Sequence, residues 1–278
     1  EPLCIEGREG RLLWISCVSC TCDGARQAEE LARKEQEERA ARELDQAYAR
    51  SGIKKRFLGA EVERPQLARY LNSFNDEPSV GLYITGPSRA GKSHSASALA
   101  KAFVASGYRT VLTTSIAMLD DVKASFDGDA KAGAARFSSC DVLIIDEVSM
   151  MHAWLFDMVD QVCREVRRDP RPFGGIQVVL SGDFFQLPPV SVSGRNRDLI
   201  APTPEFIASR ERYARAGLNP EGFITESLVW PELNPVICYL TEQHRQDTGE
   251  LLTVLTDIRE GDVTQSDRDV LVTRLGKL

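Results

Sequence analysis

The sequence lacks the features of a membrane-spanning or exported protein. In its 278 residues no run approaches the roughly 18 apolar residues that cross a bilayer, and no secretory signal opens the chain. It also has no internal repeat and no low-complexity tract. With 42% hydrophobic and 27% charged residues, the composition excludes a collagenous or wholly disordered chain. We therefore predict a globular protein of the cytoplasm. The chain begins at Glu1 rather than Met, so its length does not by itself define a complete protein.

Cysteine is present, but not in the arrangement of a disulfide framework. Three of the seven cysteines are scattered through the later part of a chain with no export signal, which favours reduced thiols. The other four crowd the N-terminal segment, residues 1–24, where Cys17 and Cys20 form a C-x-x-C pair. That spacing suits a structural Zn²⁺, and free thiols in a terminal segment are the alternative. The four candidate zinc ligands are Cys4, Cys17, Cys20 and Cys22.

The chain also lacks a surplus of positive charge, since its formal net charge is −7. Bulk charge therefore does not favour nucleic acid, although a basic groove can bind DNA locally on an acidic protein. A solvated face is the alternative interpretation of each basic cluster. The candidate DNA contacts are Lys54, Lys55 and Arg56, then Arg164, Arg167, Arg168 and Arg171, then Arg195 and Arg197.

Residues 25–52 have a composition unlike the rest of the chain. Residues 25–50 are built largely from Ala, Glu, Arg, Lys and Gln without Gly or Pro, and Ser51-Gly52 is a good helix stop. This composition predicts a charged helix. Its large apolar residues are too few for a core-facing stripe, so a solvated helix or linker is one interpretation. A helical arm that binds a protein partner is the other.

Strands and helices alternate after this helix. This alternation predicts an α/β fold in which helices flank a mostly parallel sheet. We expect a linker with a short helix in residues 53–80, a single lobe in residues 81–278, and an irregular surface insertion at residues 191–216. The expected strands are 81–85, 109–114, 141–146, 176–181 and 236–241, and the expected helices are 65–74, 92–106, 116–126 and 153–168.

The strongest motif is GPSRAGKS at residues 86–93, which matches G-x-x-x-x-G-K-[ST] between an expected strand and an expected helix. Glycines let such a loop wrap phosphates with its backbone N–H groups and the helix N-terminus. Lys92 would reach the β- and γ-phosphates, and the Ser93 hydroxyl would ligate Mg²⁺. The motif predicts an ATP site with contacts from Gly86, Pro87, Ser88, Arg89, Ala90, Gly91, Lys92 and Ser93.

Two further motifs follow expected strands. The apolar run at residues 142–145 ends at Asp146 and Glu147, which would emerge at the sheet edge where ligands bind. Asp146 would hold Mg²⁺ through water, and Glu147 would polarise the attacking water. Gln186, in GDFFQLPPV at residues 182–190, is a candidate sensor of the γ-phosphate, with an ordinary loop as the alternative. Phe184 and Phe185 in the same run are expected in the core rather than as a platform for bases.

Several stretches resemble the PIF family of superfamily 1 DNA helicases over roughly residues 143–275. The resemblance implies that Gln186 reads the γ-phosphate and that Arg245 stabilises its charge. It also implies a second motor lobe in a complete helicase. The stretches are LIIDEVSMM at 143–151, PFGGIQVVL at 172–180, GDFFQLPPV at 182–190, LTEQHRQ at 240–246, and residues 251–261.

The front half resembles DnaC- or IstB-type AAA+ ATPases, the helicase loaders. The resemblance extends over residues 81–146 and implies an ATPase that binds single-stranded DNA and a replicative helicase, with residues 1–52 as the arm for the protein partner. The order suggests a loader-like front joined to a PIF-like back. The residues that carry the likeness are SGIKKRF at 51–57, TVLTTS at 110–115 and MLDDVKASF at 118–126.

Together these resemblances imply a RecA-like P-loop NTPase lobe behind a helical N-terminal arm. The expected function is the first motor lobe of a 5′-to-3′ DNA helicase in replication, repair or recombination, and a helicase-loader ATPase is the alternative. The expected catalytic residues are Lys92, Asp146, Glu147, Gln186 and Arg245.

Overall fold

The chain forms two compact units, Glu1–Ala49 and Arg50–Leu278. In the computed structural model, none of the described helices is both long enough and apolar enough to cross a membrane. The structure describes residues 2–6, 12–17, 23–74, 81–87, 89–118, 136–186, 188–189, 204–241, 253–254, 257–258 and 261–275.

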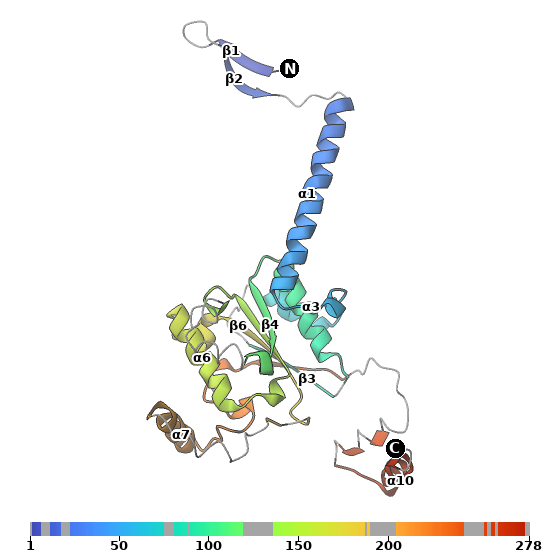
Figure 1. Cartoon of the computed structure of the whole chain (residues 1–278), viewed down its shortest axis with the longest axis vertical. Helices are drawn as coiled ribbons and strands as arrows, with labels where there is room; N and C mark the ends of the chain where they lie inside the picture. Colours follow the sequence, from blue (N-terminus) through green and yellow to red (C-terminus); the bar gives the residue numbers. More distant parts are fainter. Residues whose placement is uncertain are drawn as a thin grey trace. The chain divides into compact units, whose positions relative to one another are not determined.

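The first unit contains a hairpin and a long helix. Strands β1 (Pro2–Glu6) and β2 (Leu12–Cys17) pair antiparallel, a hairpin that the sequence patterns did not predict. Helix α1 (Asp23–Arg50), shown in Figure 1, agrees with the expected charged helix. Its side chains from Arg26 to Gln46 are exposed. The described residues contain no cluster of three or more His, Cys, Asp or Glu suited to a metal. The zinc prediction rests on the side chains of Cys4, Cys17, Cys20 and Cys22, and these side chains lie outside the described part of the chain.

Salt bridges between residues four apart support α1 along its length. Each joins a basic side chain to a glutamate one helical turn away, the spacing at which opposite charges stabilise an isolated helix. Such a helix can hold its shape without an apolar face against a core. The bridges are Lys34–Glu30 at 3.2 Å, Arg33–Glu37 at 3.6 Å, Arg39–Glu43 at 2.9 Å and Arg42–Glu38 at 3.3 Å.

The second unit is built on a five-stranded parallel sheet with the order β4-β5-β6-β3-β7. The order is that of a RecA-like α/β fold, in which the first strand of the sheet lies between the fourth and the fifth. The expected strands are therefore confirmed, each within a few residues. The strands are β3 (Leu82–Thr85), β4 (Thr110–Thr114), β5 (Val142–Asp146), β6 (Gln177–Ser181) and β7 (Val236–Tyr239).

Helices α3 (Lys92–Ala105) and α6 (Ala153–Arg167) cover opposite faces of this sheet (Figure 1). The alternation of strand side chains explains the two layers, because successive residues point to opposite faces. Leu143 and Ile145 belong to the hydrophobic cluster that contains Phe156 of α6. Ile144, between them, is also buried, and the alternation places its side chain on the opposite face. The sheet is therefore apolar on both faces, as the unbroken hydrophobic run predicts.

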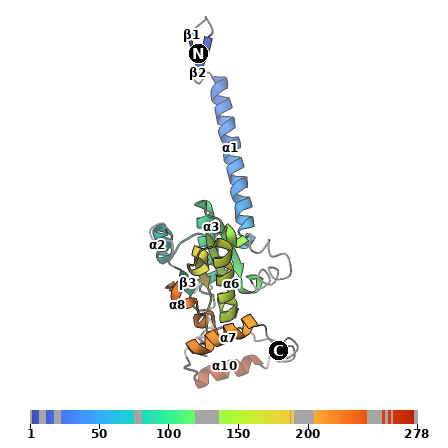
Figure 2. The ribbon, with the colours of Figure 1, turned by 90° about the vertical axis from the view of Figure 1, so that its left-hand side faces the viewer.

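Helix α2 packs against α3, and Figure 2 shows the two helices beside each other. Short 3-10 helices occur at Lys55–Phe57, Val148–Met150, Pro172–Gly175 and Ile224–Glu226. The other α-helices are α2 (Pro65–Ser73), α7 (Pro204–Ala216), α8 (Trp230–Leu233) and α10 (Gln265–Leu275).

The expected irregular insertion is wrong for residues 204–216, which form α7. Tyr213 is buried, and its hydroxyl donates a hydrogen bond to Asp157 of α6. The same carboxylate accepts the backbone N–H groups of Leu228 and Val229 at 3.0 Å each. A single buried anchor thus orders a segment whose composition is otherwise polar. Residues 191–203 and most of the expected helix 116–126 lie outside the described residues.

Candidate functional site

The predicted chemical groups gather where three neighbouring strands end. Asp146 of β5 pairs with Ser181 of β6, and Ser181 pairs with Ile84 of β3. Because these strands are parallel, their carboxyl ends lie at one edge of the sheet, where open α/β sheets bind ligands. The phosphate loop, the acidic pair and the turn that carries Gln186 all leave the sheet at this edge.

The backbone of the phosphate loop requires glycine at two positions. Gly86 has a φ of +149°, and a Cβ added to it would lie 2.4 Å from the carbonyl oxygen of Leu240. Gly91 has a φ of +84° and is the N-cap of α3. It has no side chain that could accept hydrogen bonds from the first N–H groups of the helix, so the cap position does not compete with an anion for these donors. Ser88 lies outside the described residues.

Lys92 is held against its own loop. Its Nζ donates hydrogen bonds to the carbonyl oxygens of Gly86 and Pro87, each at 2.9 Å. The same nitrogen lies 3.9 Å from Oδ2 of Asp183, and the lysine side chain is only 11% exposed. The ammonium is therefore prepositioned between the loop and the turn after β6.

The turn after β6 is organised by Asp183, whose side chain is 1% exposed. Its Oδ2 accepts a hydrogen bond from Nε2 of Gln186 at 2.9 Å, and its Oδ1 accepts the N–H of Phe185 at 3.1 Å. Gln186 thus lies at the predicted edge, with its amide in contact with the carboxylate that faces Lys92. Asp183 is absent from the predicted site residues. The only feature of the sequence that indicated a role for it was its position between the end of β6 and the amide of Gln186.

The two aromatic residues of this turn have different environments. Phe184 packs against Tyr83 and Phe223, with ring centroids 5.3 Å and 5.0 Å apart. Phe185 is 75% exposed. The expectation of a core position is therefore confirmed for Phe184 and wrong for Phe185, because only one of two successive residues in this turn can face inward.

Asp146 ends β5, and Glu147 follows it in the left-handed region with a φ of +59°. Partial burial raises the pKa of Glu147, and the neighbouring charge of Asp146 adds to this rise. Lys92 and Lys54 oppose it. The position thus combines an uncommon backbone conformation with a carboxyl group that holds its proton more tightly than a free glutamate, two features that cluster at functional sites.

Hard oxygen atoms suited to Mg²⁺ lie on one side of this edge. Ser93 is in the first turn of α3, and Asp146 and Ser181 are paired residues whose side chains point to one face of the sheet. The hydroxyl of Ser181 is buried and has no hydrogen-bond partner among the described residues. A hydroxyl, a carboxylate and a further buried hydroxyl match the oxygen ligands and ordered waters that Mg²⁺ takes. The residues present therefore fit this cation.

The segment before the sheet braces the phosphate loop from outside. Nζ of Lys101 on α3 donates to the carbonyl oxygens of Leu58 and Ala60 at 2.6 Å and 2.9 Å. The ring of Phe57 meets that of His94 edge to face, with centroids 6.3 Å apart. Nη2 of Arg64 donates to the carbonyl oxygen of Ala90, inside the loop, at 3.1 Å. These supports had no local signal in the sequence because their partners lie 26 to 43 residues away.

The arginine cluster near the end of α6 is engaged by the protein itself. Arg164 bonds to Asp160 and Glu232 at 2.8 Å each. Arg167 donates to the carbonyl oxygens of Gly174 and Cys140 at 2.7 Å and 2.8 Å. Arg171 pairs with Asp169 at 2.6 Å. These contacts favour a structural role for the cluster over a DNA contact. Arg195, Arg197 and the predicted catalytic Arg245 lie outside the described residues.

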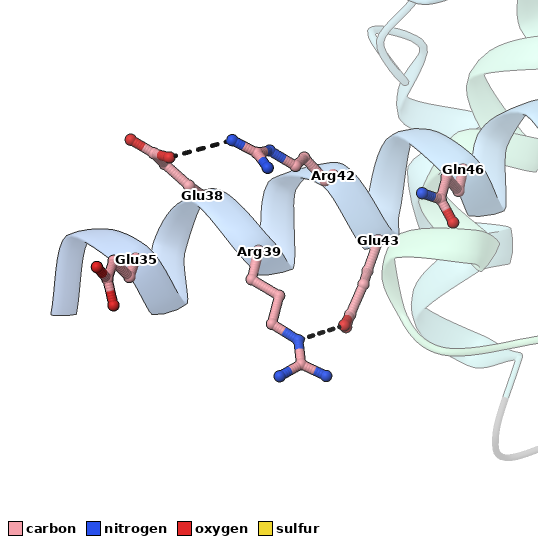
Figure 3. Close-up of a pocket in the computed structure, with 6 residues that line it drawn as sticks. All are labelled: Glu35, Glu38, Arg39, Arg42, Glu43 and Gln46. Atoms are coloured by element: carbon pink, nitrogen blue, oxygen red, sulfur yellow. Dashed lines mark hydrogen bonds and ion pairs between the residues drawn. The ribbon is translucent and has the colours of Figure 1, made fainter. Parts of the chain in front are cut away.

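A hollow also lies along α1, lined by Glu35, Glu38, Arg39, Arg42, Glu43 and Gln46 (Figure 3). All six side chains come from one exposed helix, and four of them form the Arg39–Glu43 and Arg42–Glu38 pairs. A single charged helix provides no concave apolar wall of the kind that encloses a small ligand. We assign no binding site there.

The strand order, phosphate loop and acidic pair define a RecA-like P-loop NTPase lobe. Residues 75–205 match the family model of the PIF1-like helicase. The match begins before the phosphate loop, so it includes residues that the sequence resemblance assigns to a loader-like front.

Individual proteins similar to this chain are named as ATP-dependent DNA helicases. The chain is 32% identical over 205 residues to the ATP-dependent DNA helicase PIF7 of Trypanosoma brucei brucei, covering 66% of this chain and 18% of that protein. It is 42% identical over 115 residues to the ATP-dependent DNA helicase Pif1 of a Psychrobacter species, covering 41% and 14%. The Pif1 helicase from Bacteroides, solved with ADP-AlF3 and single-stranded DNA, matches with a TM-score of 0.57 and 25% identity. That match covers 75% of this chain and 48% of the solved one. The chain thus spans less than a fifth of these curated relatives and about half of the solved helicase.

Proposed function

We propose that this chain is the ATP-binding and ATP-hydrolysing first motor lobe of a PIF1-like 5′-to-3′ DNA helicase that acts in DNA replication, repair or recombination. The observation that carries the proposal is the gathering of Lys92, Glu147 and Gln186 at one sheet edge beside an anion-binding loop. The names of the relatives, which are ATP-dependent DNA helicases, support the choice of reaction.

The chain's own groups have distinct tasks in this reaction. The first N–H groups of α3 and the Lys92 ammonium bind the phosphates, and Lys92 exchanges two loop carbonyl oxygens for phosphate oxygens. Glu147, as a carboxylate, orients the attacking water and accepts its proton. Gln186 presents its amide to the γ-phosphate. Arg245, the expected charge stabiliser, stays a prediction.

Ser93 and Asp146 are the residues that would hold Mg²⁺. When bound, this cation neutralises charge on the phosphate oxygens. The buried hydroxyl of Ser181 beside Asp146 is a further polar group that supports a hydrated cation at this place.

Single-stranded DNA is the proposed polymer substrate, and a Bacteroides relative solved with single-stranded DNA supports it. Strand separation requires a second lobe, or a neighbouring subunit, that closes on the γ-phosphate. A protein partner for residues 1–52, a zinc ion on the N-terminal cysteines and a cytoplasmic location stay predictions.

Phosphate release under steady-state conditions, with and without single-stranded DNA, tests the proposal. We expect ATP hydrolysis that DNA stimulates. Lys92→Ala should lower turnover by about 100-fold or more, because a charged group that stabilises the transition state is lost. Lys34→Ala, on the exposed face of α1, is the matched control and should keep wild-type turnover. Undiminished hydrolysis by Lys92→Ala would place the activity elsewhere.

DNA binding has its own test. Affinity for a single-stranded oligonucleotide, measured over a range of salt concentrations, should fall steeply with salt because neutralised phosphates release counterions. Affinity that does not change with salt would argue against an electrostatic DNA track.

A further inference from the structure

Asp183 is a buried carboxylate at the centre of the site. Its side chain is 1% exposed, and burial of a charge is costly unless charged or hydrogen-bonding partners compensate for it. Two bonds come from its own turn: the N–H of Phe185 on Oδ1 at 3.1 Å and Nε2 of Gln186 on Oδ2 at 2.9 Å. The compensating positive charge comes from Lys92, on the other side of the site.

One oxygen atom of this carboxylate faces both groups. Lys92 Nζ lies 3.9 Å from Oδ2, and the same Oδ2 accepts the hydrogen bond from Gln186. Lys92 is the residue that binds phosphate, and Gln186 is the residue that senses it. A negative charge between them is attracted to Lys92 and would repel an incoming phosphate. Asp183 is therefore the point at which the phosphate loop and the sensor turn meet.

We propose that Asp183 is a positioning residue that couples occupancy of the phosphate loop to the placement of the Gln186 amide. This inference rests on the proposed ATPase function. In this structure the Lys92 ammonium contacts both Asp183 and the carbonyl oxygens of the loop. When phosphate takes over Lys92, the carboxylate keeps its bonds within the turn and holds Gln186 toward the γ-phosphate. Asp183 thus weakens nucleotide binding and favours hydrolysis.

This role predicts opposite changes in binding and in turnover for Asp183→Asn, which keeps a carbonyl oxygen for the Phe185 N–H but removes the charge. A fluorescent ADP analogue should bind about fivefold more tightly, equivalent to about 1 kcal/mol, because the repulsion of phosphate is gone. The turnover number should fall by about tenfold or more, because Gln186 loses its charged anchor. A merely structural role would weaken binding and turnover together.

Two variants complete the experiment. Gln186→Ala should lower turnover while leaving the affinity for ADP unchanged, since ADP lacks the γ-phosphate. Asp45→Asn on the exposed α1 should change neither quantity. Circular dichroism checks folding. If Asp183→Asn does not fold, Asp183→Glu replaces it, with ADP affinity near wild type and reduced turnover as the expected result.

The outcomes separate the two proposals. Absence of ADP binding or of ATP hydrolysis in the wild-type chain would contradict the proposed function. If the wild type hydrolyses ATP and Lys92→Ala does not, weaker ADP binding or unchanged turnover in Asp183→Asn overturns the coupling alone. In the Asp183→Glu arm, a loss of ADP affinity or unchanged turnover has the same consequence.

Discussion

At the scale of single residues, Glu147 occupies two unfavourable states at once. Its φ is +59°, a backbone angle that residues other than glycine rarely adopt. Its partial burial and the neighbouring charge of Asp146 both raise its pKa. Functional sites often retain such costs because the chemistry requires them. We expect Glu147→Gln to lower ATP turnover by about 100-fold or more while ADP binding is retained. Phosphate release and ADP titration measure both, and Glu63→Gln, an exposed position, is the control. Turnover near wild type in Glu147→Gln would exclude Glu147 as the base.

The raised pKa of Glu147 also sets a direction for pH dependence. The carboxylate is the active form, so turnover should fall as the pH drops through this raised pKa, at a higher pH than an ordinary glutamate would give. For folding the sign is opposite. Above the raised pKa the charged group disfavours the folded state, and this penalty disappears as the pH falls. A pH–rate profile whose acidic limb lies in the usual glutamate range would contradict the assignment.

Gly86 carries a steric prediction. A methyl group there would meet the carbonyl oxygen of Leu240 at 2.4 Å, and the φ of +149° is unfavourable for alanine. Gly86→Ala should destabilise the chain by about 2 kcal/mol or more and weaken nucleotide binding. Gly59→Ala, where nothing lies within 4 Å, should do neither. Thermal unfolding and ADP titration compare the two variants, and equal stability would show that the loop can move away from Leu240.

The sequence indicated the residues of this site whose motifs are local. Lys92, Asp146 and Glu147 stand in short patterns next to a strand, so spacing alone suffices to propose them. Asp183 and Arg64 were not proposed, because their roles depend on partners across the site. The contact between Asp183 and Lys92 and that between Arg64 and Ala90 exist only once the chain has folded.

At the scale of elements, α1 depends on its own charge pairs. Its bridges at residues 30–43 are exposed, and pairs of this type stabilise a helix by about 0.3–0.5 kcal/mol each and weaken in salt. We expect a peptide of residues 23–50 to be helical by circular dichroism and to lose helicity as salt rises. Replacing Glu38 and Glu43 by Gln should reduce both the helicity and its salt dependence. Helicity that does not change with salt would show that intrinsic propensity alone holds α1.

Sequence patterns predicted the parallel strands well and the periphery less well. An unbroken apolar run such as residues 142–145 fits only a central strand of a sheet that is covered on both faces. The short hairpin β1–β2 lies in a segment where the sequence pattern predicts a metal site or free thiols rather than strands. Helix α7 was not predicted because its segment is polar, and the buried contact between Tyr213 and Asp157 joins residues far apart in the sequence.

At the scale of the whole molecule, this chain contains one nucleotide-binding lobe and matches about half of a solved Pif1 helicase. Movement on DNA requires a second surface that closes on the γ-phosphate. We therefore expect this 278-residue chain to hydrolyse ATP but to separate few or no strands of a forked duplex in a fluorescence unwinding assay. Robust unwinding by this chain alone would contradict the assignment as a single lobe.

We propose that the loop at residues 86–93 binds nucleotide phosphate through Lys92. Isothermal titration of ADP with Mg²⁺ into the chain measures this binding. We expect binding at a single site in the wild type and in Lys34→Ala, and its loss in Lys92→Ala. No heat in the wild type, or equal binding by wild type and Lys92→Ala, would contradict it.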